Sequence, residues 1–308
     1  MIVALAGGVG GAKLAAGLAR VLQPEDLVIA VNTGDDFEHL GVHVSPDLDT
    51  VMYTLAGIAN PETGWGQAGE TWSFMEALAH LGGPAWFRLG DRDLATNVER
   101  TRRLRAGETL SELTRELCAR LGVWHAVVPM SDEPVRTVVH TDRGALEFQH
   151  YFVRDRCEPR VAQLEYCGAD AARPSPALRA ALGRGDLAGV LICPSNPYLS
   201  IAPILAVPGV REAIAGRAIA VSPIIAGRAV KGPAAKIMQE LGIEPSALEV
   251  ARYYRGVARA MVIDRSDAPL AAAIEALGIG VVLEDTLMTG DADRERLARA
   301  CLAALERS

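Results

Sequence analysis

The stretch IVALAGGVGGAKLAAGLARVL, residues 2–22, decides the fold class. Ile2–Ala6 is an apolar run that predicts a buried strand, and a glycine-rich turn follows it. Lys13–Leu22 then has the three- and four-residue spacing of apolar side chains that indicates a helix. A strand, a glycine-rich turn and a helix in this order open a nucleotide-binding α/β unit.

Strands and helices alternate again in the second half of the chain. We therefore expect a Rossmann-like α/β fold, with a mainly parallel sheet and helices on both faces. Ser45-Pro46 is predicted to begin a helix with Ser45 as its N-cap, and Thr109 and Glu112 match a capping box. Strands are predicted at 27–31, 125–128, 189–193, 218–221, 260–263 and 280–283, and further helices at 71–81, 93–104, 109–121, 175–182, 233–241, 246–254, 270–277 and 294–306.

The region around 120–185 interrupts this order. Val135–Thr141 and Ala145–Val153 alternate on either side of Asp142-Arg143-Gly144, which predicts a β-hairpin. We expect one α/β domain over residues 1–308, with a helical and β-hairpin insertion in this region.

Composition excludes several classes of function. The 308 residues carry a net charge of −7, so the chain lacks the basic surplus that general nucleic-acid binding needs. Five cysteines without a CxxC pair indicate neither a disulfide framework nor a thiolate zinc site. The N-terminus has no basic segment of a signal peptide, and four prolines interrupt the uncharged stretch Leu187–Val210. We expect a cytoplasmic protein without a membrane span.

The loop from Gly7 to Lys13 is the first candidate site. Backbone N–H groups of a glycine-rich turn and of a helix N-terminus favour a phosphate. Ala12 and Leu14 do not fit a Walker A loop, and Lys13 stands where a dinucleotide fingerprint has its third glycine. The alternative is a tight turn without a ligand, and we favour the phosphate loop.

Four acids form the second candidate site: Asp35, Asp36, Asp47 and Asp49. They follow a strand or begin a helix, so we expect them at the carboxyl edge of the sheet. Carboxylates beside phosphates suggest Mg²⁺, which takes few protein ligands and keeps waters. Acids that offset a helix dipole are the alternative, and spacing leaves both open.

Three loops complete the candidates. Leu89–Asp93 follows Arg88 and is either a site or a solvated turn in which Asp93 caps the next helix. Two further loops follow predicted strands and are either ligand loops or capped turns. They are Cys193–Pro197 and the segment from Ser222 to Pro233, which includes Lys231. Cys193 has no base partner in the sequence and is interpreted as packing.

An ordered set of motifs then resembles the 2-phospho-L-lactate transferase family. The resemblance runs from residue 1 to the segment 285–288 and covers essentially the whole chain. Its motifs are AGGVGGAK (6–13), VNTGDD (31–36), SPDLDT (45–50), LGDRD (89–93), PMSD (129–132), PSNP (194–197), SPII (222–225) and DTLM (285–288).

The resemblance implies a step in the biosynthesis of the deazaflavin coenzyme F-420. A phospholactyl-type group passes from a guanosine-diphosphate-linked three-carbon acid to the ribityl hydroxyl of the deazaflavin alcohol Fo, and GMP leaves. The group can be 2-phospholactate, phosphoenolpyruvate or phosphoglycerate, and the sequence leaves this open. Family members need Mg²⁺ and commonly form dimers, so the resemblance also implies Mg²⁺ as the cofactor and a homodimer.

The resemblance also implies roles for residues. Asp49 is the catalytic candidate, which binds Mg²⁺ or orients the acceptor hydroxyl, and Asp36 and Asp47 are further metal candidates. Asp35 is left out because family loops vary there. The deazaflavin would contact Asp49, Arg88, Asp91 and Arg92. The nucleotide and donor would contact Gly8, Gly10, Gly11, Lys13, Asn32, Ser195 and Asn196.

Two other functions compete with the transferase. The related gluconeogenesis-factor proteins share the opening glycine loop and resemble sugar-nucleotide-binding regulators; the motifs at 45–50 and 89–93 favour the transferase. An NAD-dependent dehydrogenase is disfavoured by Lys13 and by Asn32, because the second strand should end in an acid that binds ribose.

Overall fold

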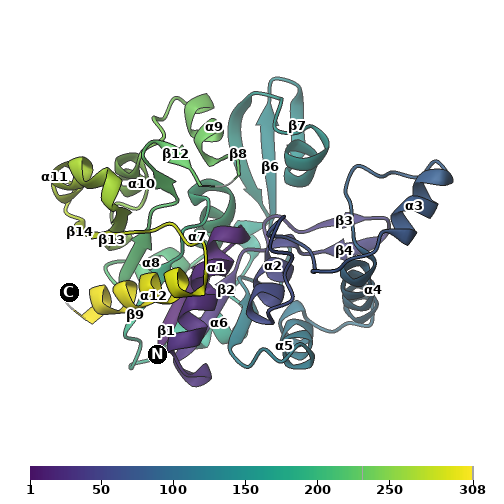
Figure 1. The fold of residues 1–308 in the computed structure, drawn as a ribbon, viewed down its shortest axis with the longest axis horizontal. Coiled ribbons are helices and arrows are strands. Elements are labelled where there is room, and N and C mark those ends of the chain that lie inside the picture. The colour runs from purple at the N-terminus through teal and green to yellow at the C-terminus, as the bar shows by residue number, and fades with distance from the viewer. Residues whose placement is uncertain (231, 307–308) are drawn as a thin grey trace.

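A parallel sheet forms the centre of the structure, a computed structural model that describes residues 1–230 and 232–306 (Figure 1). Seven strands of the described chain pair in the order β14-β13-β10-β9-β1-β2-β5, and every pair is parallel. This confirms the predicted Rossmann-like α/β fold. The strands are β1 Ile2–Ala6, β2 Leu27–Val31, β5 Ala126–Pro129, β9 Gly189–Ile192, β10 Ala218–Val221, β13 Ala258–Asp264 and β14 Gly280–Glu284.

Both faces of the sheet are covered by helices, as β1 illustrates. Ile2, Ala4 and Ala6 pack in one apolar cluster, while Val3 and Leu5 pack in the other, because successive side chains of a strand point to opposite faces. On the first face lie α1 Gly8–Val21, α2 Pro46–Leu55, α5 Leu110–Arg120 and α12 Asp291–Glu306. On the second lie α6 Pro176–Leu182, α7 Ala202–Ala206, α8 Val210–Ile214, α9 Ala234–Glu240, α10 Ala247–Tyr253 and α11 Ala271–Glu275.

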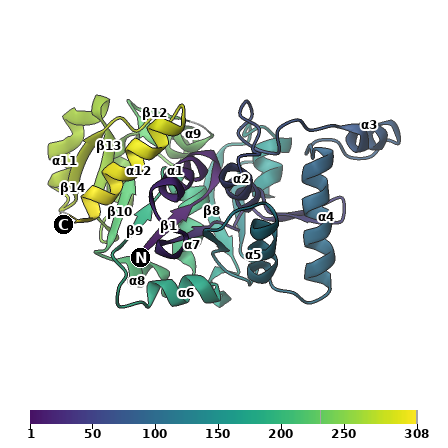
Figure 2. The ribbon, with the colours of Figure 1, turned by 60° about the horizontal axis from the view of Figure 1, so that its bottom comes forward.

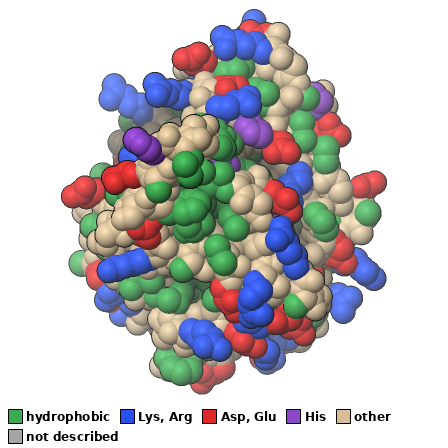
Figure 3. Space-filling model, turned by 90° about the vertical axis from the view of Figure 1, so that its right-hand side faces the viewer, with side chains coloured by type: hydrophobic (Ala, Val, Ile, Leu, Met, Phe, Trp, Pro, Cys, Tyr) green, Lys and Arg blue, Asp and Glu red, His purple; other side chains and the backbone are tan. Residues whose placement is uncertain are grey.

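One end of the molecule carries α3 (Ser73–His80), α4 (Asp91–Arg105) and the hairpin of β3 (Phe37–His39) and β4 (Val42–Val44) (Figures 1 and 2). Seen from this side, hydrophobic side chains gather between charged ones (Figure 3). These elements thus extend beyond the edge strand β5, and α4 lies beside α5.

The predicted hairpin is confirmed, and it belongs to a three-stranded antiparallel sheet. β6 (Arg136–Thr141) pairs with β7 (Gly144–Glu147) and with β8 (Val161–Cys167). The second strand ends before the predicted Val153, because His150–Arg154 forms a π-helical turn, η2. β8 was not predicted. The description as one domain with an insertion stays a prediction.

Short elements complete the described chain. A two-stranded hairpin of β11 and β12 precedes α9, and Lys231, named in the sequence argument, lies outside the described residues. The uncharged segment from 200 to 210 is mostly buried in the core. The remaining elements are β11 Ile224–Ile225, β12 Arg228–Ala229, η1 Pro24–Asp26, η3 Ala169–Ala171, η4 Pro197–Ile201 and η5 Arg265–Leu270.

Two helix starts differ from the sequence-based description. α1 begins at Gly8, five residues before the predicted start, so the glycines form its first turn. Ser45 is the N-cap of α2 as predicted, but its hydroxyl donates to Asp36 and does not cap the helix. The capping box of Thr109 and Glu112 is confirmed. No helix in residues 1–230 and 232–306 has both the length and the apolar character needed to cross a membrane.

Candidate active site

A cavity of about 590 Å³ opens at the carboxyl edge of the central sheet. Its wall includes segments that follow four adjacent strands: Gly7–Gly10 after β1, Asp35 after β2, Pro194–Asn196 after β9, and Ser222-Pro223 after β10. Open α/β sheets bind their ligands at this edge. The cavity is therefore the candidate active site.

Most of the residues singled out from the sequence meet at this cavity. Those in its wall are Gly8, Gly10, Lys13, Asp47, Asp49, Arg88, Ser195 and Asn196. Those outside its wall are Gly11, Asn32, Asp36, Asp91 and Arg92.

The first turn of α1 is held by the chain itself. Gly7 N–H donates to Ser195 Oγ (3.1 Å), and Gly8 N–H donates to Asp47 Oδ1 (2.8 Å). Gly8 has φ +61°, a conformation that favours glycine. A Cβ on Gly10 would lie 2.2 Å from the carbonyl oxygen of Pro194. Close packing against the loop after β9 (Pro194–Asn196, the β9 loop) therefore requires glycine at position 10, whatever ligand the turn binds.

We expect Gly10→Ala to lower the free energy of unfolding by about 1–3 kcal/mol, the usual cost of overpacking. The backbone of Pro194 cannot move aside as a flexible side chain would. Urea denaturation measures the change, and Gly185→Ala is the control, because a Cβ there meets no atom within 4 Å. Equal stability of the two variants would show that the turn and the β9 loop are not tightly packed.

Asn32 lies outside the cavity wall and hydrogen-bonds to two of the carboxylates. Its Nδ2 donates to Asp35 Oδ1 and to Asp47 Oδ2, both at 2.9 Å, and its Oδ1 accepts from Gly34 N–H. Asn32 is fully buried. It positions the two acids, and a direct contact with nucleotide stays a prediction.

The three acids of this cluster differ in their surroundings. Burial raises the pKa of Asp47 to about 6 and that of Asp35 well above its usual value. Asp36 Oδ2 accepts from Ser45 Oγ and contacts His43 Nε2 at 3.1 Å, whereas its buried Oδ1 has no partner in the described chain. Asp36 faces a second cavity of about 300 Å³. Of these three acids, Asp35 and Asp47 line the main cavity and Asp36 does not.

This donor set fits a cation that keeps most of its waters. In the part of the chain that the structure describes, no three His, Cys, Asp or Glu side chains are grouped as a metal site. Mg²⁺ commonly binds through one or two carboxylates plus substrate phosphates and waters. Asp35 and Asp47 can supply those carboxylates, and Asn32 holds both of them.

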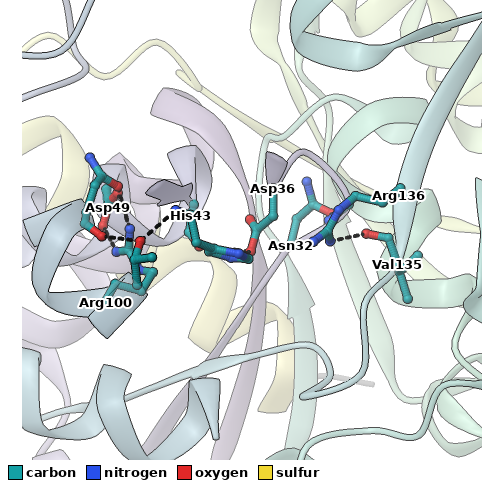
Figure 4. A network of polar contacts seen from close by, with 11 residues as sticks. Asn32, Asp36, His43, Asp49, Arg100, Val135 and Arg136 are labelled. Atoms are coloured by element: carbon teal, nitrogen blue, oxygen red, sulfur yellow. Dashed lines mark hydrogen bonds and ion pairs between the residues drawn. The ribbon is translucent and has the colours of Figure 1, made fainter. Parts of the chain in front are cut away.

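Asp49 is paired to a buried arginine (Figure 4). Arg100 donates from Nη1 to Asp49 Oδ2 (3.1 Å) and from Nη2 to Oδ1, and it donates also to Asn97 Oδ1 (2.7 Å). Burial raises the pKa of Asp49, and the charge of Arg100 opposes this. Asp49 lies in the wall, but Arg100 engages both of its oxygens.

The residues expected at the deazaflavin separate into two groups. Arg88 lies in the wall, with its guanidinium 4.2 Å from the centre of the Trp72 ring. Asp91 instead accepts from the N–H groups of Ser73 and Phe74 and so caps α3. Arg92 donates to Ala68 O. Asp91 and Arg92 thus hold the loop before α3.

The β9 loop and Lys13 complete the polar wall. Asn196 Oδ1 accepts from the N–H groups of Tyr198 and Leu199, while its buried Nδ2 has no partner within the described chain. This amide can donate to a ligand. Lys13 Nζ donates to Met288 O at 2.8 Å. Burial raises the pKa of the Cys193 thiol far above its usual range, in agreement with its interpretation as packing.

Sequence reasoning missed the polar cluster under Asp49 and the aromatic part of the wall. Asp93 lies in the wall beside Asp49, and Tyr53 donates to it. Asp93, Asn97 and Arg100 lie four and three residues apart, so one face of α4 carries all three. That spacing is the feature of the sequence from which the cluster could have been predicted. Trp65, Phe87, Phe148 and Phe152 form the aromatic wall.

Comparison with known proteins identifies the family. The model of the 2-phospho-L-lactate transferase CofD family matches residues 2–287. The chain belongs to this family. It is therefore a transferase of coenzyme F-420 biosynthesis, which confirms the resemblance read from the sequence and favours the transferase over the dehydrogenase and the regulator.

Named relatives of this CofD family member cover nearly the whole chain. Phosphoenolpyruvate transferases of Kitasatospora aureofaciens and Streptomyces avermitilis are 42% and 43% identical to it, each over 99% of this chain and 98% of theirs. The 2-phospho-L-lactate transferase of Methanothermobacter thermautotrophicus is 39% identical over the same shares. A UPF0052 family protein of Bacillus halodurans has a similar fold, with a TM-score of 0.62, 15% identity and 98% coverage of both chains.

Proposed function

We propose that the protein transfers a phosphoenolpyruvyl group from a guanosine-diphosphate-linked donor to the ribityl hydroxyl of the deazaflavin alcohol Fo. The hydroxyl oxygen attacks the phosphorus that carries the three-carbon acid. The bond from that phosphorus to the bridging oxygen breaks, and GMP leaves with the electron pair. Reactions of this kind depend on positioning and charge neutralisation more than on a covalent nucleophile.

One observation carries the proposal: a single cavity joins a phosphate-type wall to an aromatic wall. The phosphate-type wall consists of the first turn of α1, Lys13 and the β9 loop. A helix N-terminus favours phosphate oxygens. The aromatic wall and Arg88 suit a flat, polar ring system. Donor and acceptor can therefore meet between Asp47 and Asp49.

Mg²⁺ is part of the proposal. Asp35 and Asp47 would hold it, with Asp49 and Asp36 as further candidates taken from the resemblance. When bound, it would neutralise charge on the phosphates of the donor. Asn32 keeps the two carboxylates oriented toward that position.

The phosphoenolpyruvyl form is preferred over the other two acids. The phosphoenolpyruvate transferases compared above are 42–43% identical to this chain, against 39% for the 2-phospho-L-lactate transferase. The homodimer rests on the family resemblance, and the cytoplasmic location rests on the composition of the sequence. Light scattering of the purified protein tests the dimer by its mass.

We expect purified protein with Mg²⁺ and Fo to convert the enolpyruvyl donor faster than the lactyl or glyceryl donor. Mass spectrometry of the chromatographed products identifies the acid that was transferred. Omission of Mg²⁺ is the matched control and should abolish conversion. Preference for another donor would change the proposed three-carbon acid and leave the proposed reaction unchanged. Binding of guanine nucleotide without conversion of any donor would contradict the proposal and support the regulator.

A further inference from the structure

Asp93 is a carboxylate at the cavity to which the proposed function gives no role. It stands at the third position of α4 and is 8% exposed. Its side chain lies in the same wall as Asp49 and Arg88. The interpretation from the sequence, in which Asp93 caps the helix, does not hold, because the helix begins two residues earlier.

One oxygen of Asp93 is fixed, and the other is available. Tyr53 Oη donates to Oδ1 at 2.9 Å. The backbone of Asp93 is also held, since its N–H donates to Glu70 Oε1 and its carbonyl accepts from Asn97 Nδ2, both at 2.9 Å. No residue of the described chain hydrogen-bonds to Oδ2. A rigid carboxylate therefore presents Oδ2 at the cavity.

Asp93 and Asp49 have different chemistry although they share the wall. Arg100 donates to both oxygens of Asp49, whereas Oδ2 of Asp93 accepts no hydrogen bond from the described chain. Burial, with the charge of Asp49 adding to it, raises the pKa of Asp93 to about 7. A general base works best when its pKa lies near the pH of the reaction.

We propose that Asp93 is the general base for the acceptor hydroxyl, an inference that rests on the proposed transfer reaction. Oδ2 takes the proton as the hydroxyl oxygen forms its bond to the donor phosphorus. The protonated acid then releases this proton to solvent, while GMP carries away the electron pair of the broken P–O bond. Asp49, fixed by Arg100, is a positioning residue in this scheme.

Several charged or titratable groups act on Asp93. Tyr53 and Asp49 come from α2, Arg100 from α4 itself, and Glu70 from the segment before α3. The hydrogen bond from Tyr53 lowers the pKa of Asp93, and the charges of Asp49 and Glu70 raise it. Removal of the Tyr53 hydroxyl should therefore shift the titration of Asp93 to higher pH.

The test compares Asp93→Asn, Tyr53→Phe and wild type in the transfer assay between pH 5.5 and 9. We expect Asp93→Asn to reduce kcat at least about 100-fold, the range of general-base catalysis, and to abolish the acid limb of the pH profile. We expect Tyr53→Phe to keep that limb and to move it to higher pH. Glu99→Gln, an exposed acid on the same helix, should behave as wild type.

Outcomes separate this inference from the proposed function. Wild-type turnover in Asp93→Asn, or a loss of activity that keeps the original acid limb of the pH profile, would overturn the assignment of Asp93 as the general base. If Asp93→Asn fails to fold, Tyr53→Phe decides, and an unmoved limb would overturn the inference. Absence of conversion by wild type with all three donors would overturn the transfer reaction and the inference together.

Discussion

We expect Arg100→Met to lower the free energy of unfolding by about 3–5 kcal/mol, the cost of breaking a buried ion pair by removing one partner. Arg100 is 1% exposed and Asp49 is 5% exposed. Burial lowers the pKa of Arg100, but Asp49, together with Tyr53 and Asp36, raises it, so the net shift is upward and the arginine stays charged. Methionine fills similar space, so the lost charge pair dominates the change.

Urea denaturation of three variants checks this result. Asp49→Leu with Arg100→Met should recover most of the stability, because an apolar pair leaves no uncompensated charge. Arg102→Met on the same helix is the control; its pair with Glu99 is exposed and is worth less than about 1 kcal/mol. Equal effects of Arg100→Met and Arg102→Met would mean that the buried pair contributes little.

The ion pair also explains how the fold positions the site. α4 lies beyond the sheet, yet Arg100, which also donates to Asn97 Oδ1, reaches Asp49 on α2, and Tyr53 of α2 reaches back to Asp93 on α4. These contacts run in both directions between the two helices. They align Asp49 and Asp93, two of the carboxylates that line the cavity.

The central sheet was predictable because its strands are short apolar runs with clear ends. The hairpin of β3 and β4 was not. It turns at Leu40 and Gly41, with φ +53° and +72°, and leucine is not a residue that such turns usually contain. β8 lacks clear alternation, because only the first of its seven residues is buried. Glycine is a poor helix former, so the glycines among residues 8–11 did not predict the start of α1.

The glycine loop, the acids and the β9 loop were predictable as one site, because each follows a strand and parallel strands end at one edge. The cluster around Arg100 was not predictable in this way. The buried face of α4 is polar, comprising Asp93, Asn97, Arg100, Thr101 and Arg103. Apolar periodicity identifies a buried face only where that face is apolar. Which acid pairs with which base depends on how two helices pack.

The second large effect is a loss of stability as the pH rises. Burial raises the pKa of Asp47 to about 6 and that of Asp93 to about 7. A carboxyl with a raised pKa binds more protons in the folded state, so its contribution to stability is full below the unfolded pKa of about 4 and is lost as the pH rises from there through the raised pKa. We expect the ligand-free protein to lose on the order of 4 kcal/mol from these two groups between pH 5 and pH 8.

Unfolding by urea at several pH values measures this loss. Asp47→Asn with Asp93→Asn should reduce the slope by the contribution of these two groups, while Asp35 and Asp49, whose pKa values are also raised, keep theirs. His39 acts in the opposite direction, because burial lowers its pKa and protonation below pH 6.5 then favours unfolding. The difference between wild type and the double variant cancels this contribution. An identical slope in both proteins would contradict the prediction.

The same carboxylates couple stability to the cation. A cation at Asp35 and Asp47 competes with protons, so Mg²⁺ should raise the melting temperature more at pH 8 than at pH 5. NaCl at matched ionic strength controls for screening. Asp47→Asn should weaken the response, since it removes one of the two carboxylates proposed to hold the cation. A shift of equal size at both pH values would mean that Mg²⁺ binds elsewhere, because only ligands that titrate in this range make the response depend on pH.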